Sequence, residues 1–176
     1  MMQKRKVQVV AYDASWPEKF EALRQNLLPV LEDVVISIEH IGSTSVPNLA
    51  AKPIIDVLIE VTSLEALEQK TKTLREFGLV PKGENGIAGR RYFQIGGIER
   101  THNIHAFQSD SPHLLPHRAF CAYLVAHRKV AQEYAAVKQR AVLLCEQNMN
   151  SYMALKNDFI AHHLPLAIRW FQSNNE

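Results

Sequence analysis

A glycine-containing turn and one acidic residue form the part of this sequence best suited to chemistry. Gly42, Ser43 and Thr44 follow a β-branched segment, and Asp56 lies on the next predicted strand. A glycine lets the backbone approach a ligand closely, while free N–H groups and hydroxyls bind phosphate oxygens. A carboxylate on the neighbouring strand can hold Mg²⁺ against those phosphates. The pattern predicts a phosphate- and metal-binding site, with a plain strand-to-helix turn as the structural alternative.

Residues 54–61 alternate in a way that predicts a strand with two unlike faces. One face is entirely aliphatic and consists of Ile55, Val57, Ile59 and Val61. The other face consists of Ile54, Asp56, Leu58 and Glu60. Burying a carboxylate in so apolar a segment is costly unless it serves a purpose. We therefore favour Asp56 as a catalytic residue and metal ligand over a helix-capping or ion-paired carboxylate.

Three basic residues are predicted to neutralise phosphate charge near this turn. Lys52 precedes the strand that carries Asp56, and Arg90 and Arg91 follow a glycine-bearing loop. Guanidinium groups clamp phosphates or carboxylates, and a lysine contacts a phosphate as a point charge. Consecutive residues on a strand point apart, so one arginine is expected at the site and the other in a surface ion pair. We favour Arg91 for the site.

The first predicted helix begins after Ser15, which with Glu18 has the S-x-x-E spacing of a capping box. Pro29 is expected to bend or loosen its last turn. Its apolar face comprises Phe20, Leu23, Leu27 and Leu31. Residues 34–41 are a predicted strand. Leu64, Leu67, Thr71 and Leu74 then follow the periodicity of an amphipathic helix, which is predicted to end at Gly78.

The second half of the chain changes character. Residues 91–95 and 100–107 are predicted to pair as a hairpin around Gly96 and Gly97. From His117 onward the pattern is helical, with an interruption at residues 148–151 and a tail after Pro165. Interleaved strands and helices followed by helices alone predict an α/β (α+β) fold. We expect a single domain, with an α/β core over residues 1–110 and a helical cap over residues 111–176.

Composition and charge exclude several classes of protein. The 176 residues are 47% hydrophobic and 22% charged, which is typical of a folded domain. A net charge of +2 argues against a dedicated binder of duplex DNA or of a membrane surface. No apolar run reaches the roughly 20 residues of a membrane span, and no signal peptide is predicted. The two cysteines, Cys121 and Cys145, fit small core residues in a reducing compartment, so we expect a cytoplasmic protein.

The segment HIGSTSVPNLAAKPIIDV, residues 40–57, resembles the GrpB-like family of the nucleotidyltransferase superfamily. Further resemblance lies in the segments GIAGRRYF, RTHNIHAF, HRAFCAYLVAH, EYAAVK and YMALKNDFI, and together they cover roughly residues 8–163. The resemblance implies a nucleotidyltransferase-like mixed β-sheet flanked by helices, with a C-terminal helical segment. It also implies binding of a nucleoside triphosphate, or another phosphorylated small molecule, and a divalent metal, Mg²⁺ or Mn²⁺.

The sequence departs from the superfamily pattern at one position. That pattern has a Gly-Ser turn, then two carboxylates two residues apart on the next strand, and often a third on a neighbouring strand. Asp56 matches the first carboxylate, but Leu58 replaces the second. Glu60 lies about 6.6 Å further along the strand and cannot substitute for it. Two readings follow: one-metal catalysis, or nucleotide binding without catalysis.

A histidine of residues 100–107 could supply a ligand in place of the missing carboxylate. A spacing of three places His102 and His105 on opposite faces of a strand, so they are not expected to share one metal. His105 matches the family's recurrent histidine and is implied as the second metal ligand or as a catalytic base. A mixed Asp/His site favours Mn²⁺ or a related metal over Mg²⁺.

The sequence is therefore compatible with three functions. The first is metal-dependent transfer of a nucleotidyl or phosphoryl group from a nucleoside triphosphate to an unidentified acceptor. The second is a non-catalytic nucleotide- or anion-binding module, suggested by Leu58. The third, a metal hydrolase using the histidines between His102 and His117, is weakened by the absence of HExxH spacing. A homodimer is left open by the apolar pair Trp170 and Phe171 near the C-terminus.

Overall fold

The computed structural model describes residues 4–175, and residues 1–3 and 176 of the predicted domain lie outside this range. The helices are α1 (Trp16–Leu31), η1 (Ser43–Ser45, a 3₁₀ turn), α2 (Leu64–Gln69), α3 (Thr71–Glu76), α4 (Leu114–Ala126), α5 (Arg128–Leu144) and α6 (Met149–Asn174). The strands are β1 (Val35–Ile41), β2 (Ile55–Val61), β3 (Val80–Pro81), β4 (Arg90–Ile95) and β5 (His102–Gln108).

The five strands form one mixed sheet in the order β1-β2-β5-β4-β3. Strands β2 and β5 run parallel, and every other neighbouring pair is antiparallel. The parallel pair needs a long crossover, which the chain makes through α2, α3 and the β3–β4 hairpin. This architecture confirms the predicted mixed sheet flanked by helices.

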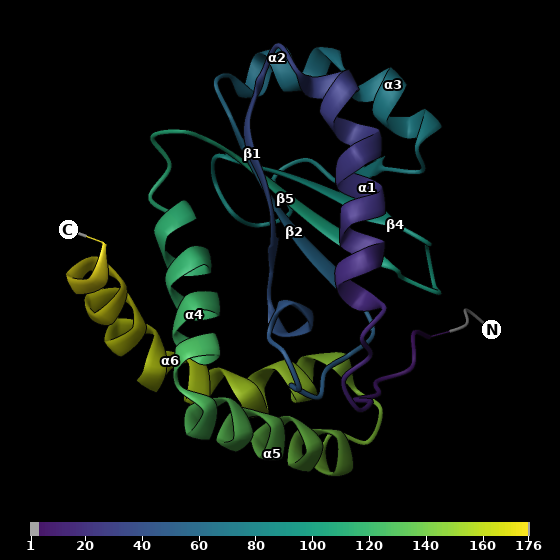
Figure 1. Cartoon of the computed structure of the whole chain (residues 1–176). Helices are drawn as coiled ribbons and strands as arrows, with labels where there is room; N and C mark the ends of the chain where they lie inside the picture. The colour runs from purple at the N-terminus through teal and green to yellow at the C-terminus, as the bar shows by residue number, and fades with distance from the viewer. Residues whose placement is uncertain (1–3, 176) are drawn as a thin grey trace.

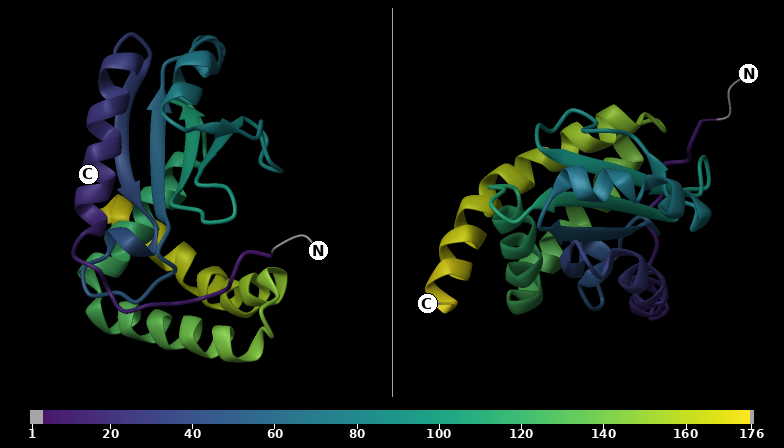
Figure 2. Two further views of the ribbon diagram at one scale, coloured as in Figure 1. Left: turned by 90° about the vertical axis from the view of Figure 1, so that its right-hand side faces the viewer. Right: turned by 90° about the horizontal axis from the view of Figure 1, so that it is seen from above.

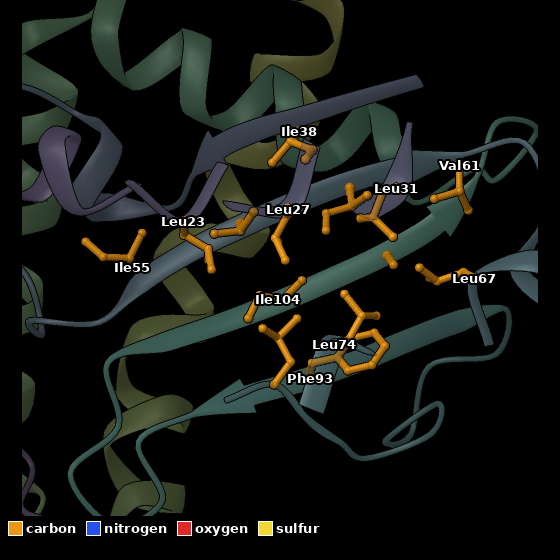
Figure 3. Close-up of a cluster of buried hydrophobic side chains, with 14 of the residues drawn as sticks. Leu23, Leu27, Leu31, Ile38, Ile55, Val61, Leu67, Leu74, Phe93 and Ile104 are labelled. Carbon is orange, nitrogen blue, oxygen red and sulfur yellow. The ribbon is translucent and has the colours of Figure 1, made fainter. Parts of the chain in front are cut away.

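One face of the sheet is covered by α1, α2 and α3. The predicted aliphatic face of β2 packs there against Leu27 and Leu31 of α1, both fully buried, and against Leu67 and Leu74. Figure 3 shows these side chains meeting between α1 and the strands. Burial of this apolar face is the main force that fixes the sheet and hence the direction of the other face.

The opposite face of the sheet is more polar, and α4 packs on it. Arg118 of α4 donates to Glu39 of β1 at 2.7 Å and to Glu60 of β2 at 2.5 Å. An apolar contact lies beside this ion cluster and consists of Ile41, Leu58, Phe107 and Leu114. These contacts anchor α4 against the two strands.

Helices α5 and α6 cross beneath one end of the sheet, where β1 ends and β2 begins (Figure 1). The N-terminal segment runs along the same helices (Figure 2). Its Val7 is buried, and its backbone N–H and carbonyl bond the Gln147 side chain between α5 and α6. Within the described chain, no helix is both long and apolar enough to cross a membrane.

Several local predictions are wrong. Ser15 does not cap α1, because its side chain makes no capping bond; instead Asp13 accepts from the Ser15 N–H. The helix predicted over residues 64–74 is divided at Lys70 into α2 and α3. The hairpin forms, but its second strand begins at His102 rather than at residue 100, so the loop spans residues 96–101 rather than 96–99.

The helical region also differs at its two ends. It starts at Leu114, earlier than the predicted His117. Pro165 lies inside α6, so the predicted tail is the last part of that helix. Trp170 of α6 packs against Tyr123 of α4 and against His127, which directly follows α4, with ring centroids 5.9 and 5.1 Å apart, and thus docks within its own chain.

Candidate functional site

The glycine turn and the acidic residue meet at the end of the sheet. Ile41 pairs with Asp56 across β1 and β2, so the turn begins opposite the carboxylate. Gly42 has φ +69°, and a Cβ at this position would lie 2.8 Å from Asp56 Oδ2. Both the backbone conformation and this contact therefore require glycine. The turn and the carboxylate therefore lie against each other, which is the geometry that the predicted site requires.

The 3₁₀ turn leaves two backbone donors without a partner inside it. Ser45 N–H bonds the Gly42 carbonyl, and Val46 N–H bonds the Ser43 carbonyl. The N–H groups of Ser43 and Thr44 come too early in the turn to find a carbonyl within it. The Thr44 side chain is buried and shares a hydrogen bond with His40 Nε2 at 2.9 Å. The Thr44 hydroxyl is therefore already engaged by His40, and its contact with a phosphate stays a prediction.

Three lysines from three elements surround the carboxylate. Lys52 precedes β2, Lys138 lies on α5 and Lys156 on α6, and all three line a pocket of about 220 Å³ with Asp56. The remaining pocket residues are Ser43, Thr44, Ala51, Ile54, Asn103, His105, Tyr152 and Met153. The predicted basic residue Lys52 is thus at the site, together with two lysines that the sequence analysis did not identify.

The lysine ammonium groups are held by carbonyl and aromatic groups. Lys138 is almost fully buried; its Nζ donates to the Ala50 carbonyl and lies 4.6 Å from the centre of the Tyr134 ring. Lys52 Nζ and Lys156 Nζ lie 5.0 and 5.6 Å from the centre of the Tyr152 ring. Such contacts orient a cation without neutralising its charge.

Burial and mutual repulsion weaken the protonation of these lysines. Burial, and then the charges of the other two lysines, lower the pKa of Lys138 to about 7. Burial, Lys156 and Arg5 lower the pKa of Lys52 to about 8. Burial alone raises the pKa of Asp56, but the His105 hydrogen bond and the charges of Lys156 and Lys52 outweigh it, and the pKa is lowered. The pocket thus holds more positive than negative charge and favours an anion.

His105 lies between Asp56 and Arg90. Its Nε2 is 3.4 Å from Asp56 Oδ1, and its Nδ1 is 3.3 Å from Arg90 Nη1. Because a guanidinium group only donates, Nδ1 accepts, and the proton of the neutral ring is assigned to Nε2, facing Asp56. In this arrangement neither nitrogen is free to bind a metal or accept a proton. The structure therefore favours His105 as a residue that positions Asp56, not as the predicted metal ligand or base.

The two arginines lie on opposite sides of the sheet, and neither lines the pocket. Arg90 is buried, donates to the carbonyls of Glu84 and Asn85 and reaches His105. Arg91 instead pairs with Glu68 of α2 at 2.5 Å, so it lies on the other side of the sheet. The preference for Arg91 at the site is wrong. Arg90 acts behind His105 and does not line the pocket itself.

The missing second carboxylate is not replaced from nearby. Leu58 is fully buried, and Glu60 is bound by Arg118. No group of three or more His, Cys, Asp or Glu side chains that could hold a metal occurs within residues 4–175. The metal-hydrolase hypothesis, which relies on such a group, gains no support from this part of the chain. Asp56 fits a Mg²⁺ that takes its other ligands from substrate phosphates and water, the usual arrangement for this ion.

A sequence signal for the two missed lysines exists. In α5, Lys138 follows the buried Tyr134 by four residues; in α6, Lys156 follows the buried Tyr152 by the same spacing. A spacing of four places each lysine on the buried face of its helix. A lysine on an otherwise apolar face is a candidate for a binding site.

Comparisons with known proteins agree with this architecture. A sequence model of the family described as GrpB protein matches residues 6–165. The UPF0157 protein YqkA of Bacillus subtilis (strain 168) is 44% identical over 172 residues, which cover 98% of this chain and 50% of YqkA. The chain thus spans about half the length of that relative.

Two solved structures relate the fold to known ones. A crystal structure of the conserved protein GrpB from Enterococcus faecalis is 36% identical, has a TM-score of 0.90, and the alignment covers 94% of this chain and 99% of that one. A crystal structure of the Cid1 poly(U) polymerase is 15% identical with a TM-score of 0.50, over 74% of this chain and 45% of Cid1. The second likeness concerns the fold alone. The chain belongs to the GrpB family and has a nucleotidyltransferase-like fold.

Proposed function

We propose that this chain binds the phosphates of a nucleoside triphosphate in the Asp56 pocket and transfers its nucleotidyl group to an acceptor hydroxyl. The observation that carries the proposal is the meeting of Lys52, Lys138 and Lys156 around one carboxylate beside a glycine turn. Three ammonium groups and two turn N–H groups match the several oxygens of a polyphosphate.

The size of the pocket supports binding of the phosphates rather than of the whole nucleotide. Its volume of about 220 Å³ is below the roughly 300–1,000 Å³ of pockets that enclose a small ligand. The nucleoside must therefore extend out of the pocket. Tyr152 also lines the pocket, and its hydroxyl is buried without a hydrogen-bond partner among the described residues.

In the proposed reaction the acceptor oxygen attacks the α-phosphorus of the nucleotide. The bond from that phosphorus to the bridging oxygen of the β-phosphate breaks, pyrophosphate leaves, and the hydroxyl proton passes to solvent. Lys52 and Lys156 hold the charge that develops on the leaving phosphates. Asp56, oriented by His105, would hold a divalent ion, which supplies further stabilisation of phosphate charge when bound.

Isothermal titration calorimetry with ATP and Mg²⁺ tests the binding step. We expect Lys156→Gln to weaken binding about 10-fold, because one charge-assisted hydrogen bond is lost. Lys129→Gln is the matched control, since Lys129 is exposed on α5 outside the pocket. Equal affinities of wild type and Lys156→Gln would refute this use of the pocket.

A non-catalytic anion-binding module is the second candidate, and Leu58 favours it. Phosphoryl-transfer sites with two metals use carboxylates to bridge both ions. A pyrophosphate-release assay over a panel of hydroxyl acceptors separates the two functions. Release by wild type that Asp56→Asn abolishes supports transfer; tight ATP binding with no release from wild type, and release gained by Leu58→Asp, supports the module.

A further inference from the structure

A basic groove leads away from the Asp56 pocket along the N-terminal segment. It consists of two adjoining cavities of about 760 and 780 Å³, which share Lys4, Arg5, Ile98 and Arg100. Lys52 lines both the first cavity and the Asp56 pocket, so the two spaces adjoin at this side chain. The cations of the groove are Lys4, Arg5, Lys6, Lys52, Lys82 and Arg100.

The inner cations of this groove lack counter-ions. Arg5 and Lys52 donate to the sulfur of Met149, at 3.9 and 3.8 Å, and Arg100 donates to Asn103 Oδ1 at 3.2 Å. In residues 4–175 none of these three cations has a carboxylate oxygen within 4.0 Å. Burial, followed by the charge of Arg100, lowers the pKa of Arg5, so the two guanidinium groups lie close enough to repel each other. An anion between them would relieve that repulsion.

The N-terminal segment is held in place and so presents Arg5 in a fixed position. Val7 exchanges hydrogen bonds with the Gln147 side chain at 2.9 and 3.1 Å, and Val10 pairs with Ala51. Figure 2 shows this segment passing beside α6. Gln147 itself has φ +61°, a conformation that non-glycine residues adopt only when the surrounding structure enforces it. A cationic side chain held in this way loses little entropy when it binds an anion.

The lining indicates the kind of anion. None of the described lining residues is aromatic, so the groove offers no ring on which the bases of a single-stranded nucleic acid could stack. Each cavity falls within the roughly 300–1,000 Å³ of small-molecule sites. These features favour a compact molecule with phosphate groups over a nucleic acid strand.

We propose that the basic groove binds the acceptor of the transfer reaction and that this acceptor is a small molecule with a phosphate group of its own. The acceptor phosphate lies between Arg5 and Arg100, and its hydroxyl extends past Lys52 towards Asp56. This inference rests on the proposed function, because it takes the Asp56 pocket as the site of the nucleotide. The acceptor oxygen then forms the new bond to the α-phosphorus as pyrophosphate leaves.

Calorimetry with fructose 1,6-bisphosphate as the probe tests the groove. The titration is made with the full chain saturated with Mg²⁺ and α,β-methylene ATP, which cannot release pyrophosphate. We expect one bisphosphate per chain, and at least about 10-fold weaker binding in the double variant Arg5→Gln/Arg100→Gln. Arg75→Gln, an exposed arginine of α3 outside the groove, is the matched control and should bind as wild type.

The remaining outcomes each decide the proposal. Absent bisphosphate binding, or equal binding by wild type and the double variant, overturns it. Binding of a labelled single-stranded octanucleotide at least 10-fold tighter than the bisphosphate also overturns it, in favour of a nucleic acid acceptor. If bisphosphate binds in the groove but the ATP analogue does not bind to the chain, the anion site stands while the proposed function and the acceptor role both fail.

Discussion

Successive residues of β2 belong alternately to two very different faces of the sheet. Val57 and Ile59 face α1 and are fully buried among aliphatic side chains. Asp56 and Glu60 face the other way and contact His105 and Arg118. The first face buries the larger aliphatic cluster, whereas the second, apart from the buried Leu58, holds charged groups in fixed positions.

The comparison shows how the apolar face makes the polar one possible. Ion pairs and buried lysines add little to stability and can reduce it. The cluster under α1 has no such groups, so it can compensate for them. Substitutions on the two faces should therefore separate stability from function.

Asp56→Asn should have the largest effect, and it should fall on function. The variant loses the negative charge that would hold a divalent ion and that accepts a hydrogen bond from His105. We expect nucleotidyl transfer to fall at least about 100-fold, while the thermal midpoint changes little. Pyrophosphate release and calorimetric melting measure the two effects; a fully active Asp56→Asn would place the chemistry elsewhere.

Ile59→Ala tests the opposite face of the same strand. Removing this buried side chain leaves a cavity under α1 and should cost about 2–5 kcal/mol of unfolding free energy. The affinity for ATP of the molecules that remain folded should not change. Urea denaturation and titration below the transition check both statements, and a selective loss of affinity would show that the two faces are coupled.

Gly42→Ala should lower both the stability of the fold and the affinity of the site. The added Cβ meets Asp56 Oδ2 at 2.8 Å, and φ +69° strains any residue with a side chain. We expect a loss of about 1–3 kcal/mol of stability together with weaker Mg²⁺-dependent binding, because the carboxylate must move. Gly83→Ala is the control: it also has positive φ but no atom within 4 Å, so strain alone remains.

Nucleotide binding should depend on pH through the lysines of the pocket. The pKa of Lys138 is about 7 and that of Lys52 about 8, and a bound polyphosphate raises both. Binding at pH 8 should therefore take up protons, and the affinity should fall as pH rises from about 7 to 9.5. Titrations in buffers of different ionisation enthalpy measure the uptake, whose absence would mean that these lysines do not meet the phosphates.

Lys138→Met should have a small effect on folding, of the opposite sign to the effects of Ile59→Ala and Gly42→Ala. The lowered pKa means that the unfolded chain binds more protons than the folded one between about pH 7 and 10.5, so this lysine destabilises the fold at neutral pH and less so as pH rises. We expect the variant to gain about 1 kcal/mol at pH 7 and to bind ATP more weakly. A gain that is the same at pH 7 and pH 10 would contradict this explanation.

The alternation of β2 was sufficient to predict both faces of the strand, whereas the contact of Asp56 with the glycine turn also depends on the pairing of β1 with β2. Arg90 could not be chosen over Arg91, because the decisive contacts are with backbone carbonyls of the loop at Glu84 and Asn85. Those contacts depend on the loop conformation and not on residue type. Strand pattern thus predicts faces, but not which side chain a loop will capture.

The lysines of α5 and α6 were missed for a different reason. Local periodicity places Lys138 on a buried helix face, yet only the packing of two helices under the sheet brings it to Asp56. The role of His105 could not be predicted either, since it follows from the hydrogen bond that Arg90 on the neighbouring strand donates to its ring. Both depend on tertiary contacts between residues distant in the sequence.

The most direct test of the central claim is a crystal structure with α,β-methylene ATP and Mn²⁺. We expect the β- and γ-phosphates to lie between Lys52 and Lys156, with an anomalous peak beside Asp56 and no Mn²⁺ bond to His105. Phosphates bound away from all three lysines, or a manganese ion held at another place, would contradict it.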